Sequence, residues 1–415
     1  MKTIFKIRYS TIVNILISFI IVCYVGPFAS YKGSLIMVGL LGMILLFLYF
    51  KQGFYSKKYI FIWHILSIYL ILNSLLNLPN SLKYLLVFFV GLSLVQRKLF
   101  IHDYKQVFLT CKLVSILNAF FTIIQSLQPD FYYSFAKKWF FYSNQYEQVV
   151  YLGQYCKKLS GLFYEVSFSA LILSIGIVLY TVELFENRKK IKYILNVCLI
   201  LISYYAIILT GKRSFILIVP SVIVLLYLFK MRQQITIKHI IILFIGLIIF
   251  AFSSNVIYDI VLNIVSKGKG DGADLSSREL FWGLAFNMFK SNPLIGKGLN
   301  SFDIFFNTSG IREMYYDFAG AHNSYVQILG ETGLMGFLLY FFAIFHSLFR
   351  GLKIIFVGCK DEIYLYGAVG ILLVMLVYAF SGNVLYQPQQ IITIFWNISI
   401  IENYYKKEIK KTIVL

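Results

Sequence analysis

Apolar residues in this chain gather into long runs rather than into the short amphipathic patterns of a soluble protein. Runs of roughly 17–20 residues recur along the chain, about the length that a helix needs to cross the hydrocarbon core of a bilayer. A transmembrane barrel is excluded, because its strands would be about ten residues of alternating polarity. We therefore expect an all-α fold, a polytopic bundle of about twelve membrane helices. The predicted spans are residues 11–29, 34–50, 59–77, 82–95, 107–127, 162–182, 193–209, 214–229, 239–254, 333–349, 363–380 and 389–402.

Two long polar loops interrupt these apolar runs. The larger covers residues 255–332, after the ninth predicted span, and a loop of this length is usually functional. The smaller covers residues 128–161, and its many aromatic rings suit either an interfacial belt or a surface that stacks on sugars. We expect spans one to nine with the aromatic loop at residues 1–254, a catalytic loop at 255–332, and spans ten to twelve with a basic tail at 333–415.

Lysine and arginine residues gather at the N-terminus, in alternate loops and in the C-terminal tail. By the positive-inside rule these segments are cytoplasmic, so we expect both termini inside and both long loops outside. The formal net charge of +20 follows from this bias, and no nucleic-acid partner is expected. The first apolar run is followed at once by another span and is not expected to be a cleavable signal peptide. No metal-ligand spacing is present, so we expect neither a metal nor another cofactor.

Arg278 lies in a segment of the large loop that predicts an amphipathic helix. Ser276 and Glu279 fit an S-x-x-E capping box that opens this helix, and residues 280–289 place apolar side chains on one face. Arg278 would then lie in the first turn, where its guanidinium and the helix N-terminus both attract an anion such as phosphate. The alternative is an ordinary surface arginine.

His322 is the only one of the five histidines that we expect on the outer side of the membrane. Histidine is the natural general base near neutral pH. A single histidine just before an apolar helix can equally be structural, so this residue alone leaves both interpretations open.

Lys212 and Arg213 lie between two predicted spans on the outer side, against the positive-inside trend. An anionic lipid headgroup or a diphosphate substrate would explain two cations there. Snorkelling to phospholipid phosphate is the alternative. Glu165 lies at the outer mouth of the sixth predicted span, where it could form an ion pair with Arg213 or bind sugar hydroxyls.

Short motifs in a fixed order connect these residues, and as a set they resemble the O-antigen ligase/polymerase family. The resemblance extends to the predicted topology and to the place of the large outer loop. In chain order the motifs are Gly161-Leu-Phe-Tyr-Glu165, Thr210-Gly-Lys-Arg-Ser214, Arg278-x3-Trp282, Asn292-Pro-Leu-Ile-Gly-Lys-Gly298, His322-Asn-Ser-Tyr325 and Gly330-Glu-Thr-Gly333.

The resemblance implies an enzyme that moves glycans from undecaprenyl diphosphate at the outer face of the bacterial inner membrane, without a metal. It implies that Arg213 and Arg278 bind the diphosphate and that His322 activates the acceptor hydroxyl. Lys212 is a departure, because family members often have a small residue there, and we expect it to share in diphosphate binding. The same motifs mark four supporting residues, which are Glu165, Trp282, Asn323 and Tyr325.

The function expected from the sequence is that of a Wzy-type polysaccharide polymerase. It would join undecaprenyl-diphosphate-linked oligosaccharide repeat units into O-antigen or into capsular or exopolysaccharide. Its partners would be that donor, membrane lipids and a chain-length regulator protein. One alternative is the ligase branch, which passes finished glycan to another acceptor, and a more distant one is a cell-wall glycosyltransferase. A flippase or exporter of lipid-linked sugars is the alternative from another class, but such transporters usually have short loops and internal pseudo-symmetry.

The predicted topology can be tested with reporter fusions. A reporter at Lys190 should report a cytoplasmic position and one at Gly270 an outer position, because basic residues mark only the first of these loops as cytoplasmic. A cytoplasmic result at Gly270 would contradict the placement of the large loop, and with it the placement of the site.

Overall fold

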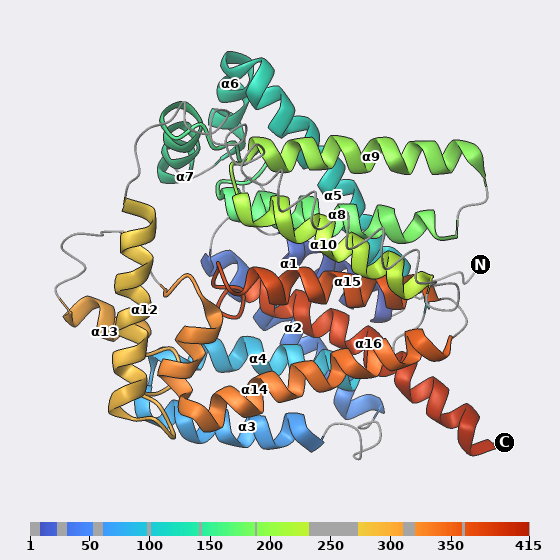
Figure 1. Ribbon diagram of the computed structural model, residues 1–415. Helices are drawn as coiled ribbons and strands as arrows, with labels where there is room; N and C mark the ends of the chain where they lie inside the picture. The colour runs from blue at the N-terminus through green and yellow to red at the C-terminus, as the bar shows by residue number, and fades with distance from the viewer. Residues whose placement is uncertain are drawn as a thin grey trace, which may run out of the picture. The chain divides into compact units, whose positions relative to one another are not determined.

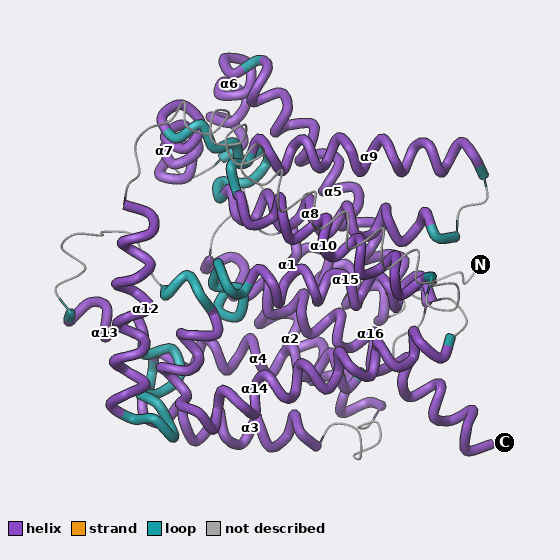
Figure 2. Tube along the Cα trace, in the orientation of Figure 1, coloured by secondary structure: helices purple, strands orange, loops and turns teal. Residues whose placement is uncertain are grey.

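The structure, a computed structural model, describes most of the chain as helices joined by short loops. Every regular element within the described residues is a helix (Figure 2), which confirms the all-α class for this part of the chain. The predicted ninth span at 239–254 lies outside the described residues. These residues are 9–22, 31–52, 61–97, 101–140, 143–186, 189–231, 273–309, 320–358 and 362–414.

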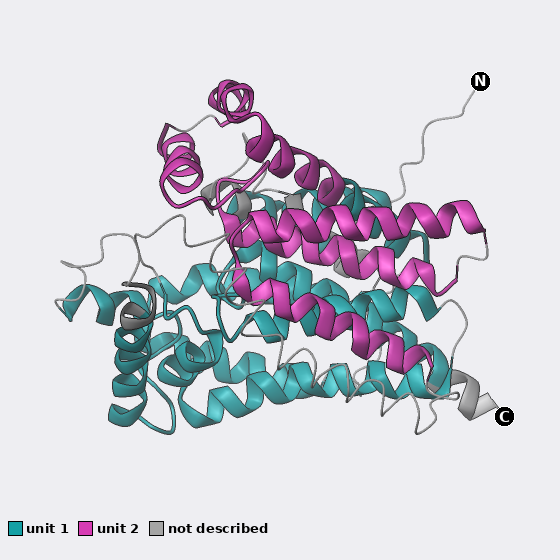
Figure 3. Cartoon of the chain, turned by 45° about the horizontal axis from the view of Figure 1, so that its top comes forward, with its two compact units in different colours: residues 1–24, 28–113, 272–415 teal, residues 25–27, 114–271 magenta. Residues whose placement is uncertain are grey.

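The chain forms two compact units (Figure 3), and the boundary between them falls within one helix, α5 (Ile101–Leu127). The first unit comprises residues 1–24, 28–113 and 272–415. Besides the start of α5, its helices are α1 (Tyr9–Val22), α2 (Tyr31–Gln52), α3 (Phe61–Ser74) continued by η3 (Leu75–Asn77), α4 (Asn80–Gln96), α12 (Ala273–Ser291), α13 (Phe302–Thr308), α14 (Ser324–Val357), α15 (Glu362–Tyr378) and α16 (Pro388–Val414).

The second unit comprises residues 25–27 and 114–271. Within it α8 packs against both α9 and α10, and almost every side chain of α8 is buried, as expected for a helix that is apolar on all sides. Besides the end of α5, its described helices are α6 (Pro129–Trp139), α7 (Ser143–Val150), the π-helical turn η4 (Tyr151–Tyr155), α8 (Val166–Leu184), α9 (Lys190–Leu209) and α10 (Arg213–Lys230).

Five of the described helices are long and apolar enough to cross a membrane, which are α5, α8, α9, α10 and α14. Shorter apolar helices accompany them. These lengths and compositions fit a helical membrane protein. The count of about twelve spans stays a prediction.

The aromatic loop predicted at 128–161 forms α6, α7 and η4, which pack around a small core of their own. Tyr132 and Phe140 are buried in this core beside Val149, so part of the aromatic content stabilises the loop itself. Tyr151 and Tyr155 stack on each other, 5.7 Å between ring centroids, and both are exposed. These two rings remain available for either predicted role.

In the first unit a bundle supports the end of α14. Figure 1 shows α3, α4, α14 and α16 side by side, with α12 crossing the end of α14, and these neighbours are in contact. Aromatic rings fill the interior, where Phe395 lies 5.2 Å from Trp63 and 5.3 Å from Phe88 between centroids. A partly buried ion pair of 2.8 Å between Arg350 and Glu402 joins α14 to α16.

Helix α14 is broken at Gly333, which has φ 64° and ψ −172°. A break in a buried helix leaves backbone groups without their usual partners, and each costs roughly 1–3 kcal/mol if it stays unpaired. Here the turn at residues 293–298 supplies the missing partners. The four bonds run from Leu334 N to Pro293 O (2.8 Å), Met335 N to Leu294 O (3.1 Å), Lys297 N to Gly330 O (3.2 Å) and Gly298 N to Glu331 O (2.8 Å).

This pairing explains why glycine stands at Gly296 and Gly333. Both have positive φ, and a Cβ on either would meet the backbone of the other segment. Polar side chains of the α3 end hold the same turn from another side. Asn73 donates to the Ile295 carbonyl (2.7 Å) and Asn77 to the Leu299 carbonyl (2.9 Å).

Helix α12 begins at Ala273, so the predicted capping box at Ser276 and Glu279 is wrong. Ala273 and Leu275 are good helix formers, which allows the helix to start upstream of the serine. Arg278 therefore lies in the second turn, and the free N–H groups of the helix start belong to residues before it.

Substitution at the break tests the backbone pairing. Gly333→Ala should lower the free energy of unfolding by more than about 1 kcal/mol, because alanine resists positive φ and its Cβ would meet backbone. The measurement is thermal stability of the purified protein in detergent.

Gly283→Ala is the matched control. It lies within α12, and a Cβ there has no atom within 4 Å, so it should be neutral or stabilise by about 0.5–1 kcal/mol. Equal stability of the two variants would contradict the importance of the break.

Candidate functional site

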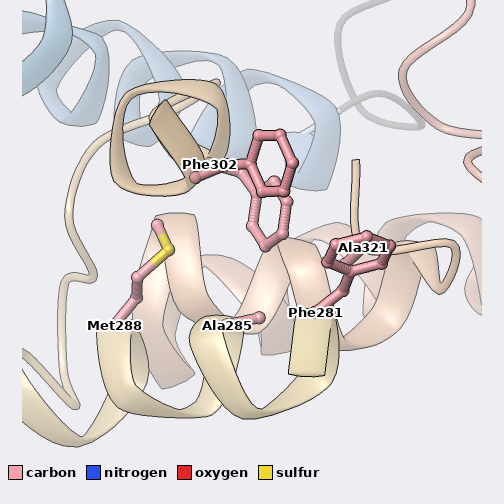
Figure 4. Close-up of a cluster of buried hydrophobic side chains, with 6 residues drawn as sticks. Phe281, Ala285, Met288, Phe302 and Ala321 are labelled. Carbon is pink, nitrogen blue, oxygen red and sulfur yellow. The ribbon is translucent and has the colours of Figure 1, made fainter. Parts of the chain in front are cut away.

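Helix α12 is the platform of the candidate site. Its buried residues Phe281, Ala285 and Met288 pack with Phe302 of α13 and with Ala321 (Figure 4). These are the i, i+4 and i+7 positions of one helix face, as the apolar pattern predicted. Neighbouring apolar side chains such as Leu280 remain exposed, so the packed face is narrower than expected.

The peptide groups of Ala321 are held on both sides. Its N–H donates to Oε1 of Gln327 (3.0 Å), and its carbonyl accepts from Nε1 of Trp282 (3.0 Å). Trp282 was expected to support the site, and its bond to Ala321 places it next to the histidine segment; its supporting role stays a prediction.

His322 follows immediately and has a positive φ of 51°. This left-handed conformation is uncommon for a residue that is not glycine, and it persists only where the surroundings fix it. The imidazole is partly buried, with its ring centroid 6.2 Å from that of Phe281. His322 therefore lies on the surface of the α12 platform, in a segment with a defined backbone.

Asn323 is the N-cap of α14. Its side-chain oxygen accepts from the backbone N–H groups of Tyr325 (3.0 Å) and Val326 (3.2 Å). Asparagine commonly caps helices in this way, and its replacement by alanine typically lowers the free energy of unfolding by about 1 kcal/mol. Asn323 thus fixes where the helix begins, one residue after His322.

Tyr325 anchors the same helix start in the bundle. Its hydroxyl donates to the Leu376 carbonyl (2.8 Å), and its ring stacks between Phe341 (4.6 Å) and Phe380 (4.2 Å). Its support for the site is therefore structural.

Arg278 lies on α12 four residues before Trp282, so the two share a helix face. Its side chain is partly buried. Arg278 thus lies one helical turn before Trp282, the residue that bonds the segment leading to His322. The position of Arg278 is therefore set by the face of α12, and the residue does not lie at the helix N-terminus as predicted.

Glu165, Lys212 and Arg213 belong to the second unit. Lys212 is the N-cap of α10 and Arg213 its exposed first residue. Burial raises the pKa of Glu165, which directly precedes α8, and the charge of Lys212 opposes that shift. Lys212 is therefore a cation that acts on Glu165, and it is the neighbour of the expected Arg213.

A further cation lies beside this turn and was missed. Lys158 covers Gly211, where its Cγ is 3.0 Å from the place of a Cβ, and Leu159 N donates to the Leu209 carbonyl (3.1 Å). The signal was in the sequence, since Lys157 and Lys158 are also basic residues in a predicted outer loop. Joint binding of one diphosphate by Arg213 and Arg278, which lie in different units, stays a prediction.

Glu331 joins three segments of the first unit. It is fully buried, and both carboxylate oxygens accept two hydrogen bonds each. The donors are Asn300 N (2.7 Å), Phe302 N (3.2 Å), Gln327 Nε2 (3.0 Å) and Tyr386 Oη (2.8 Å). In the sequence, Glu331 stands out only as part of the Gly330-Glu-Thr-Gly333 motif. A carboxylate four residues after a glutamine in an otherwise apolar helix was the available signal.

Within the described residues, no group of three or more histidine, cysteine, aspartate or glutamate side chains could hold a metal ion. Independence from metals stays a prediction.

Comparison with known families gives one match. Residues 197–341 match a family described as O-antigen ligase, and this confirms the resemblance inferred from the motifs. The matched region contains Lys212, Arg213, Arg278, Trp282, His322, Asn323 and Tyr325. Glu165 lies before it. No curated protein matches the chain.

The role of Glu331 can be tested by an isosteric change. Glu331→Gln must point an amide NH₂ at two of the four donors, so it should lower the free energy of unfolding by about 1.5–3 kcal/mol or more. Thermal stability in detergent is the measurement.

Asp303→Asn is the control with the same chemical change. Burial raises the pKa of Asp303, so a neutral side chain is tolerated there and the effect should stay within about 0.5 kcal/mol. A Glu331→Gln variant as stable as the wild type would show that the carboxylate is not what joins these segments.

Proposed function

Since residues 197–341 match the O-antigen ligase family, we propose that this chain is a membrane glycosyltransferase that takes its glycan from undecaprenyl diphosphate at the outer face of the bacterial inner membrane. The family implies glycosyl transfer from a lipid-linked glycan in general terms. The lipid, the side of the membrane and the independence from metals are our proposal.

The proposed step transfers one glycosyl group. His322 takes the proton of an acceptor hydroxyl, and that oxygen attacks the anomeric carbon of the donor glycan. The bond from this carbon to the diphosphate oxygen breaks, and undecaprenyl diphosphate leaves with the electron pair. Arg278 stabilises the charge on the leaving group. Diphosphate binding by Arg213 and Lys212 of the second unit remains the role that the motifs imply. A base and fixed cations are sufficient, because a diphosphate is already a good leaving group.

One observation carries this proposal. The α12 face that bears Arg278 also holds the His322 segment, through the Trp282 bond to the Ala321 carbonyl and the Phe281 ring. A cation suited to phosphate and an imidazole suited to a hydroxyl thus belong to one packed structure. Catalysis by positioning needs this kind of rigid support.

Within the family we propose the polymerase activity, in which the growing chain is the donor and one new lipid-linked repeat unit is the acceptor. A chain-length regulator would be a partner in that case. The second candidate is a ligase that passes finished glycan to another acceptor, the activity that the description of the matching family names. The two share the step above and differ in the acceptor, so purified acceptors of both kinds distinguish them.

Loss of the proposed base is the direct test. His322→Ala should lower the rate of transfer by about 10²–10⁴-fold, the usual contribution of general-base catalysis. The acid limb of the wild-type pH profile, which reports protonation of the base, should disappear in the variant. The measurement is transfer from purified lipid-linked repeat units at saturating substrate across pH 5–9, with and without EDTA.

His64→Ala, an exposed histidine of α3, is the matched control and should behave as the wild type. Arg278→Ala should weaken donor binding, whereas His322→Ala should leave it nearly unchanged. A His322→Ala variant that transfers at the wild-type rate would contradict the assignment, and loss of wild-type activity in EDTA would contradict the metal-free step.

A further inference from the structure

Gln327 lies one helical turn inside α14 and connects Glu331 to the segment that leads to His322. It is almost completely buried. Its Oε1 accepts from the N–H of Ala321, and its Nε2 donates to Oε1 of Glu331, both at 3.0 Å. The backbone N–H can only donate, so the amide orientation is fixed by its partners and cannot be reversed without loss of a bond.

The segment before His322 closes tightly around this amide. At Gly320 a Cβ would lie 3.1 Å from Oε1 of Gln327 and would collide with the side-chain amide of Asn383. Only a residue without a side chain therefore brings the chain this close to Gln327. On the far side of Ala321, Trp282 holds the carbonyl.

The backbone bonds of Ala321 constrain His322 directly. His322 lies between Ala321, whose N–H and C=O are both bonded, and Asn323, which caps α14. The Gln327 bond holds the peptide between Gly320 and Ala321, and the Trp282 bond holds the next peptide, between Ala321 and His322. Loss of the Gln327 bond would free the first of these peptides, and with it the backbone that leads into the positive φ of His322. The position of the imidazole thus depends on Gln327, which in turn is held by Glu331.

We propose that Gln327 is the positioning residue of the transfer reaction, which transmits the rigid Glu331 junction to the backbone of His322. This inference rests on the proposed function, since it assigns Gln327 a role through the base His322. Gln327 has no contact with the reacting groups in this role. It sets the direction of the imidazole toward the acceptor hydroxyl.

Two substitutions separate positioning from simple stability. Gln327→Met removes both hydrogen bonds at similar volume, and kcat should fall on the order of 10–100-fold with KM for the donor little changed, because small misplacements of a catalytic group are costly. In the His322→Ala background the same substitution should have almost no further effect on kcat, since no base remains to be positioned.

Gln327→Glu gives a second, pH-dependent readout. A protonated carboxyl group has the acceptor and the donor of the amide, whereas an ionised one loses the donor and faces the Glu331 carboxylate. The ratio of its kcat to that of the wild type should therefore rise as pH falls from 9 to 6. The ratio for Gln327→Met should stay low and constant.

Thr393→Val is the control, a buried hydroxyl of α16 that bonds within its own helix, and it should leave kcat and KM unchanged. The inference is overturned if Gln327→Met keeps the wild-type kcat, if its effect is equally large in the His322→Ala background, or if the Gln327→Glu ratio is independent of pH. Those results leave the proposed function intact when His322→Ala alone is inactive. If His322→Ala is as active as the wild type, the proposed function itself fails.

Discussion

The break of α14 at Gly333 and its repair by the turn at 293–298 are the constraint on which the site depends. A helix interrupted inside a bundle must find other partners for its backbone groups, and the buried residues around Gly333 cannot obtain them from solvent. The turn provides four such bonds, and the Glu331 carboxylate adds bonds to two further N–H groups of the following residues. These bonds attach the turn at 293–298 to the backbone of α14.

A series of hydrogen bonds connects this junction to the candidate site. Glu331 is bonded to Gln327, Gln327 to the Ala321 backbone, and Ala321 to Trp282 on the platform helix α12. The residues proposed to act on the substrate, Arg278 and His322, lie at the end of this series. Electrostatic and general-base catalysis both need groups that do not reorganise during the reaction. The buried polar bonds of the first unit supply that rigidity.

Much of the helical fold could be predicted from run length alone. The predicted spans at 193–209 and 214–229 match α9 and α10 closely, because uninterrupted apolar runs leave few alternatives to a helix. The span predicted from Gly333 is instead the second part of a longer helix, α14. The first part of α14 was not predicted, because the Gly330-Glu-Thr-Gly333 sequence is typical of a helix end. The helix continues there only because the distant turn at 293–298 bonds its backbone.

The site was only partly predictable for a related reason. Side-chain chemistry indicated Arg278 and His322, and the family motifs indicated Trp282 and Asn323. The role of Gln327 depends on a bond to the backbone N–H of Ala321, and backbone partners leave no signature in a sequence. The capping box at Ser276 failed because α12 already includes Ala273 and Leu275, two good helix formers, so that Ser276 lies inside the helix.

The central claim is that this chain forms a glycosidic bond and breaks the bond that links the donor glycan to a polyprenyl diphosphate. The most direct measurement counts both products in liposomes that contain only the purified protein and a lipid-linked repeat unit. The account predicts one undecaprenyl diphosphate released for each new glycosidic bond. Movement of the lipid-linked glycan across the bilayer, with neither bond formation nor release of the diphosphate, would contradict it and identify a transporter.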